Sequence, residues 1–145
     1  MKKICFIADF YSDQINGGGE SNDYNLILSL SQENEVVCYR SSEVTIKLIK
    51  DFDVFIIGNF IQLEERTKGF LIKNKKYIIY EHDHKYVTTR DPSKFSNFLV
   101  PKNNLINVDF YEQSHTTIVL SKVCQEVLKL NLPDVNIINI GCSLW

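Results

Sequence analysis

The chain has 145 residues, enough for one domain with its own core and too few for two comfortable ones. Hydrophobic residues make up 44% and charged residues 23%, which excludes a disordered tail, a coiled coil and a collagen-like rod. Its 16 basic and 18 acidic residues give a formal net charge of -2, so we expect no nucleic-acid partner. The apolar run over residues 4–8 is shorter than a signal-peptide core, and we expect a cytoplasmic protein.

The cysteines, Cys5, Cys38, Cys124 and Cys142, are scattered and show no Cys-x-x-Cys or Cys/His spacing typical of a metal site. A free thiol inside an apolar run behaves as a small hydrophobic side chain. We therefore expect reduced, structural cysteines and no bound metal.

Apolar runs of strand length alternate with segments of helical period in the first half of the chain. The predicted strands here are residues 3–8, 35–39 and 53–58. A glycine-rich loop and a helix connect the first two strands. Val44, Leu48 and Phe52 recur every fourth residue and predict a second helix, which Ser41 or Ser42 could cap.

The same alternation continues in the second half. The remaining predicted strands are residues 76–80, 116–120 and 135–140. A long polar stretch, residues 82–104, follows the fourth strand, and a helix is predicted over 105–111. Ser121 is the expected N-cap of a helix that Pro133 ends.

This order predicts an α/β protein: a doubly wound, mostly parallel six-stranded sheet with helices on both faces, Rossmann-like, in one domain over residues 1–145. In such sheets, ligands bind where the strands end at their carboxyl edge. The loops after the strands are therefore the places to look for a site.

Gly17, Gly18, Gly19 and Glu20 lie between the first strand and the first helix. Glycines let a backbone approach a ligand closely, and a helix N-terminus offers free N–H donors to a phosphate or a sugar. The pattern is neither GxGxxG nor a P-loop, which argues against a dinucleotide or nucleoside triphosphate site. The alternative is a flexible surface loop.

Glu81, His82, Asp83 and His84 follow the fourth strand at the same expected edge. His82 could act in acid–base chemistry, and a His-x-His pair on an extended segment points both rings to one side. The alternative is a solvated strand end.

Three further features allow both a binding and a structural interpretation. Arg90 could bind a phosphate or pair with Asp91 or another surface acid, and Ser121 could present its hydroxyl to a ligand or only cap its helix. A basic cluster could touch an anionic membrane surface or form a solvated helix face. Its members are Arg66, Lys68, Lys73, Lys75 and Lys76.

Three segments, in order, resemble a known family. GGGE (17–20) resembles the GG[AG]E element of GT-B glycosyltransferases of the large retaining, nucleotide-sugar-dependent group (GT4-like). YIIYEHDHKYVTTRDPS (77–93) resembles the region after the fourth strand in a phage and marine microbial subgroup. TTIVLSKVCQEVL (116–128) with VNIINIG (135–141) resembles the closing part of the N-terminal domain.

The resemblance implies the N-terminal, acceptor-side domain of a glycosyltransferase, with a sugar or glycan acceptor and a nucleotide-sugar donor as co-substrate. It implies no metal and no other cofactor. It further implies that the donor-binding C-terminal domain is absent from this chain, so we expect the isolated chain to be inactive and to self-associate through the bared cleft surface.

By the same resemblance, Gly18 and Gly19 approach the donor diphosphate or the acceptor, Glu20 steadies the loop or meets acceptor hydroxyls, and His82 lines the reaction centre. Two other hypotheses remain: a stand-alone flavodoxin-like binding or regulatory module without catalysis, and a hydrolase using His82 and Asp83. The hydrolase lacks a GxSxG elbow.

Overall fold

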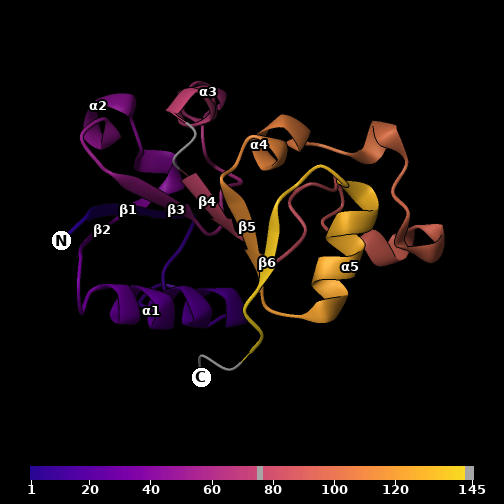
Figure 1. Ribbon diagram of the computed structural model, residues 1–145, viewed down its shortest axis with the longest axis horizontal. Coiled ribbons are helices and arrows are strands. Elements are labelled where there is room, and N and C mark those ends of the chain that lie inside the picture. The colour runs from indigo at the N-terminus through magenta and orange to yellow at the C-terminus, as the bar shows by residue number, and fades with distance from the viewer. Residues whose placement is uncertain (75–76, 143–145) are drawn as a thin grey trace.

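Six strands form one sheet at the centre of the protein, which a computed structural model describes over residues 1–74 and 77–142. The strands are β1 (Lys3–Ala8), β2 (Glu35–Arg40), β3 (Val54–Ile57), β4 (Tyr77–Tyr80), β5 (Thr116–Val119) and β6 (Ile137–Asn139). All neighbouring pairs are parallel, and the order is β2-β1-β3-β4-β5-β6 (Figure 1). The predicted α/β, Rossmann-like fold is confirmed.

Helices connect the strands on both faces of the sheet. They are α1 (Gly18–Leu30), α2 (Ile46–Ile49), α3 (Glu65–Asn74), α4 (Val108–Glu112) and α5 (Lys122–Asn131). In Figure 1, α1 covers one face and α2, α3 and α4 lie on the other. No helix in the described ranges combines the length and apolar character that a membrane crossing requires.

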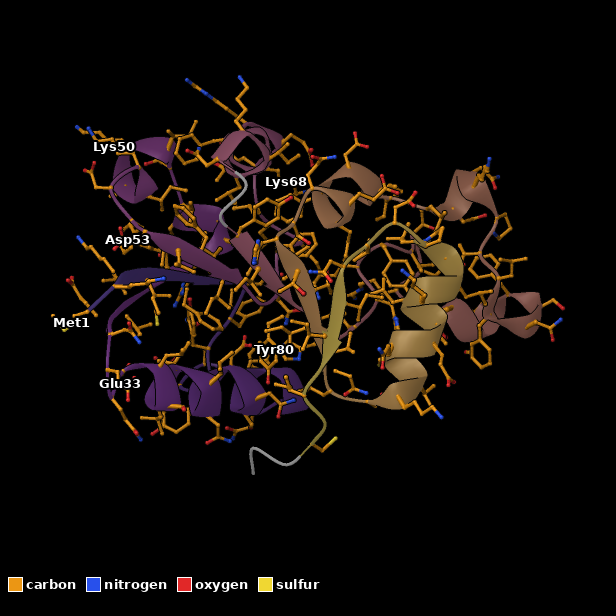
Figure 2. The ribbon with its side chains drawn as sticks, in the orientation of Figure 1. Met1, Glu33, Lys50, Asp53, Lys68 and Tyr80 are labelled. Atoms are coloured by element: carbon orange, nitrogen blue, oxygen red, sulfur yellow. The ribbon has the colours of Figure 1, made fainter. Side chains whose placement is uncertain are left out.

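The core follows from the two-residue period of the strands, which places alternate side chains on opposite faces. Cys5 and Ile7 of β1 belong to the larger core beneath α2–α5, whereas Ile4 and Phe6 belong to the smaller core beneath α1. Tyr80 also lies on the α1 side of the sheet (Figure 2). Both faces of the central strands are therefore buried, as expected for a parallel sheet.

The predicted second helix is wrong in length and cap. The only α-helical turn of that segment is α2, with Thr45 as its N-cap, and Leu48 is exposed. Val44 and Phe52 are buried, but both lie outside α2, so their four-residue spacing does not reflect one face of a helix. Ser41 caps nothing, because its hydroxyl donates to Asp9.

The predicted helix over 105–111 is α4, which begins three residues later, because Leu105 forms an isolated antiparallel bridge with Val87. The polar stretch 82–104 contains 3₁₀ turns at Pro92–Lys94, Ser96–Phe98 and Lys102–Asn104. Asn131 of α5 ties this stretch down, accepting from the amide of Val100 (2.8 Å) and donating to the carbonyl of Phe98 (2.9 Å).

Candidate functional site

The carboxyl ends of β1, β3 and β4 lie side by side, because these strands are parallel neighbours in the sheet. The chain order reverses between β1 and β3, the place where open α/β sheets bind ligands. Asp9, Gly58 and Glu81 are the first residues after the three strands. We call this edge the rim.

The glycine loop forms the first turn of α1 at the rim. Gly17 is the N-cap residue and supplies no side-chain cap. The carboxylate of Glu20 folds back onto Gly17, so closely that a Cβ at Gly17 would collide with it. A negative charge at this end of a helix stabilises it, so Glu20 steadies the loop and sits where an anion would otherwise bind.

Gly19 brings the loop against the turn after β4. A Cβ built on Gly19 would lie 3.5 Å from Cγ of His82, and a larger side chain would push the two segments apart. The prediction that the glycine loop and the histidine turn share one rim is confirmed.

His82 is oriented by a carboxylate from α1. Its Nε2 lies 2.8 Å from Oδ1 of Asp23, and the two side chains are only 7% and 1% exposed. Burial raises the pKa of Asp23, although the hydrogen bond with His82 opposes that change. A carboxylate behind an imidazole fixes the orientation of the ring, which prepares the other ring nitrogen for proton exchange.

Two buried oxygens beside His82 have unused hydrogen-bonding capacity. Within the described residues, Oδ2 of Asp23 and the hydroxyl of Tyr80 are the buried side-chain atoms without a hydrogen-bond partner. The Tyr80 ring packs edge-on against His82, with centroids 4.5 Å apart. Unsatisfied buried polar atoms are rare in proteins and gather at functional sites.

Glu81 organises the turn that carries His82. Its Oε1 accepts from the amides of Asp83 (2.9 Å) and His84 (2.8 Å) and from Nζ of Lys85 (3.2 Å), and its Oε2 accepts from the hydroxyl of Tyr111. Burial alone would raise the pKa of Glu81, but Lys85 and these donors lower it to about 2. Glu81 therefore stays ionised and holds the turn in one conformation.

Asp83 and Arg90 belong to the same ion-pair network. Lys85 is buried and contacts Glu81, Asp83 and the side chain of Asn59, and Asp83 also pairs with Arg90 at 3.1 Å. The structural alternative for Arg90 is confirmed: it pairs with a surface acid, which is Asp83 and not its sequence neighbour Asp91. Glu81 and Asp83 are both paired with cations, so Asp83 is poorly placed to act as a free base.

His84 faces away from the His82 pair. Its φ angle is 53°, so the segment is not extended there, and the prediction that both rings point to one side is wrong. Nδ1 of His84 lies 2.9 Å from the hydroxyl of Tyr86, and the ring also hydrogen-bonds to Cys124. That bond lowers the pKa of the Cys124 thiol.

The described residues contain no group of three or more His, Cys, Asp or Glu side chains arranged to hold a metal ion. The four cysteines are free thiols, but only Cys5 is buried; Cys38 and Cys142 are exposed, so the predicted structural role does not hold for them. Ser121 caps α5, with its Oγ 3.1 Å from the amide of Cys124, which confirms its structural role.

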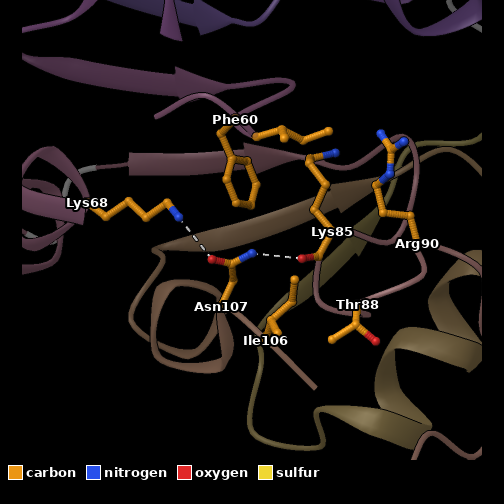
Figure 3. A pocket seen from close by; sticks show the side chains of 8 residues that line it. Phe60, Lys68, Lys85, Thr88, Arg90, Ile106 and Asn107 are labelled. Carbon is orange, nitrogen blue, oxygen red and sulfur yellow. Dashed lines mark hydrogen bonds between the residues drawn. The ribbon is translucent and has the colours of Figure 1, made fainter. Parts of the chain in front are cut away.

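Asp9 shapes the loop after β3. Its Oδ2 accepts from the amide of Ile61 (2.9 Å), and its Oδ1 accepts from the amide of Gln62 (3.1 Å) and from Ser41. Asp9 thereby fixes the position of Phe60 and Ile61, which line a cavity of about 380 Å³. The cavity is lined by Phe60, Ile61, Lys68, Lys85, Thr88, Arg90, Ile106 and Asn107 (Figure 3).

Lys68 points into this cavity rather than to solvent, so the interpretation of the basic cluster as a solvated helix face is wrong for this residue. Its side chain is 9% exposed and its Nζ donates to Oδ1 of Asn107 at 3.0 Å. Figure 2 shows Lys68 between α3 and α4. Lys75 and Lys76 of the cluster lie outside the described residues.

Sequence reasoning missed four residues that build the rim: Asp9, Asp23, Lys85 and Tyr111. Asp9 follows the first strand directly, and that position is a signal that could have found it. The other three are recognised only through partners far along the chain, such as Asp23 with His82.

Known proteins give no further assignment. The chain matches no protein-family model, and comparison with curated proteins and with solved structures finds no significant match. What is established is an α/β fold with a six-stranded, all-parallel sheet in Rossmann-like arrangement.

Proposed function

We propose that this chain is the acceptor-side domain of a nucleotide-sugar-dependent glycosyltransferase. In this proposal the rim forms one wall of a sugar-binding crevice, and a second, donor-binding domain supplies the other wall. The contact between Gly19 and the Asp23-oriented His82, at the edge where the strand order reverses, is the observation that carries the proposal.

The chemistry of the rim suits a polyhydroxylated ligand. Asp23 and Tyr80 each hold an unpartnered polar atom buried beside His82, so the polar groups around this ring are not all satisfied within the chain. Glu20 already places a negative charge at the first turn of α1, which disfavours a diphosphate there and favours acceptor hydroxyls. His82 lines the reaction centre, and Gly18 and Gly19 present their backbone to the sugar.

The test is a backbone NMR titration of the ¹⁵N-labelled chain with UDP-glucose, UDP-N-acetylglucosamine, GDP-mannose and methyl glycosides. We expect saturable shifts centred on Gly18, Gly19 and His82 with the methyl glycosides, because Glu20 disfavours the diphosphate of the nucleotide sugars there. Gly19→Val should abolish them, because its side chain would displace His82. Gly69→Val in α3 is the matched control, since a Cβ at Gly69 meets nothing within 4 Å. No shift with any sugar or nucleotide sugar contradicts the proposal.

A flavodoxin-like binding module is the second candidate, because the strand order contains 2-1-3-4-5, the order in which flavin mononucleotide binds at the β1/β3 switch point. FMN is therefore part of the same titration. Saturable binding of FMN without any response to sugars would replace the first proposal with this one.

A further inference from the structure

The cavity beside the rim has a one-sided charge. Three of its lining residues are cations, Lys68, Lys85 and Arg90, and none is an acid. The acids that pair with them are not among the lining residues: Glu81 is buried behind Lys85 with 1% of its side chain exposed, and Glu65, the partner of Lys68, is 86% exposed. Asp83, whose side chain is 36% exposed, pairs with both Lys85 and Arg90. The lining of the cavity therefore carries cations and neutral side chains but no carboxylate.

Lys68 is the cation with the weakest compensation. Its side chain is nine-tenths buried, yet its one carboxylate partner, Glu65, is almost fully exposed to solvent. A solvated partner of this kind offsets little of the free energy that burying an ammonium group costs. Asn107 contributes only a neutral oxygen. An anion in the cavity would supply the missing compensation.

The lysines are held on one aromatic platform. Nζ of Lys68 and Nζ of Lys85 lie 5.7 Å and 5.4 Å from the ring centroid of Phe60. Asn107 fixes the geometry further, accepting from Lys68 and donating to the backbone oxygen of Lys85 at 2.9 Å, as the dashed lines in Figure 3 show. Arg90 contributes a third, more exposed cation.

We propose that this cavity binds the oxyanion of a compact, polyhydroxylated ligand, such as a sugar phosphate or a sugar carboxylate. Its volume of about 380 Å³ is in the range of small-molecule sites. Phe60 and Ile106 supply an apolar wall, and Thr88 and Asn107 supply hydrogen-bonding groups. Identifying that ligand as the acceptor rests on the proposed function; the oxyanion site itself does not.

The experiment is an NMR titration of the full chain with inorganic phosphate, glucose 6-phosphate, glucuronate and glucose. We expect saturable shifts at the amides of Ile61, Ile106 and Asn107 with the anions, and at least tenfold weaker binding of glucose. The phosphate and carboxylate arms distinguish the two sources of the oxyanion. Equal binding of glucose, shifts outside the cavity, or no saturable binding of any anion overturns the proposal.

The variants are Lys68→Met and Arg90→Gln, which should each weaken anion binding about tenfold, because each removes a charge-assisted hydrogen bond. Lys73→Met, on the exposed surface of the same helix as Lys68, is the charge-matched control and should bind as the parent does. Lys68→Arg keeps the charge and should retain anion binding. It tests the role of the charge even if Lys68→Met folds poorly. Unchanged affinity in both Lys68→Met and Arg90→Gln overturns the proposal. These readouts do not involve Gly19 or His82, so they can fail independently of the glycosyltransferase assignment.

Discussion

Asp23 on α1 and His82 after β4 lie 59 positions apart in the sequence and form a buried hydrogen bond of 2.8 Å. The same carboxylate lies against Gly58 at the end of β3. One side chain therefore touches two strand ends from the helix that follows the first strand.

Gly58→Ala should destabilise the protein. A Cβ at this position would lie 2.6 Å from Oδ2 of Asp23, so the carboxylate must move and its bond to His82 is strained. We expect a loss of about 2 kcal/mol in the free energy of unfolding, measured by urea denaturation. Gly69→Ala is the control; its Cβ meets open space within α3, and it should gain about 0.5 to 1 kcal/mol. Equal stability of the two variants would contradict this account.

Asp23→Asn should change stability in a pH-dependent way. The pKa of Asp23 is raised above 3.8 in the folded protein, because burial favours the protonated form. The contribution of this pKa shift to the free energy of unfolding is therefore complete below pH 3.8 and is lost as pH rises through the folded pKa. The stability of Asp23→Asn relative to the parent should therefore increase with pH across this window. Urea denaturation from pH 3 upward is the measurement, and a pH-independent difference would refute the prediction.

Glu81 should give the opposite pH dependence. Its pKa is lowered from 4.5 to about 2, so its stabilisation is present above pH 4.5 and is lost as pH falls toward 2. The shift corresponds to about 3 kcal/mol. Glu81→Gln should remove this acid dependence and destabilise the protein at pH 7, because Lys85 loses its buried partner. Glu33→Gln, at an exposed position, should do neither.

Cys124 should react with iodoacetamide at neutral pH faster than Cys5 or Cys38. Its hydrogen bond with His84 lowers the pKa of its thiol, whereas burial raises the pKa of Cys5 to about 12 and also raises that of Cys38. Peptide mass spectrometry measures each rate. His84→Gln should slow Cys124 alone.

His115→Gln is the matched control for that experiment, because His115 is exposed. It should leave the rate at Cys124 unchanged. If His84→Gln has no more effect than His115→Gln, His84 does not activate the Cys124 thiol.

Asp9→Ala should loosen the loop after β3. It leaves the amides of Ile61 and Gln62 without their carboxylate acceptor, which should cost about 2 to 4 kcal/mol in unfolding free energy. Asp13→Ala, an exposed acid nearby, should be neutral. Amide hydrogen exchange at Ile61 should rise in the first variant; unchanged protection there would show that Asp9 does not hold the loop.

The sheet could be predicted from the sequence because its signal is local. Residues 54–57, for example, are apolar throughout, as is typical of a strand buried on two faces. The second helix could not be predicted, because Val44 and Phe52 are buried by separate parts of the fold and only imitate a helical spacing.

The rim was predictable only in part. The glycine loop lies between the first strand and the helix that follows it, and His82 lies in the turn after the fourth strand, so their position in an α/β sheet identified them. Asp23 and Lys68 gave no such signal, because a charged residue in a helix is ordinarily exposed and both are buried by tertiary contacts. Likewise, the sequence showed Arg90 beside Asp91, but the fold brings Asp83 to it.

The long connection between the adjacent strands β4 and β5 also affects the order in which the chain folds. Joining these strands requires closing a loop over residues 81–115, which costs about 2 kcal/mol more chain entropy than a five-residue connection. Tyr86, Phe110 and Tyr111 of this connection enter the core, and their burial can offset the entropy cost only once β4 is in place. We therefore expect β1–β4 to assemble first and the remaining strands to dock late, so that the cavity and the Glu81 network are among the last parts to form.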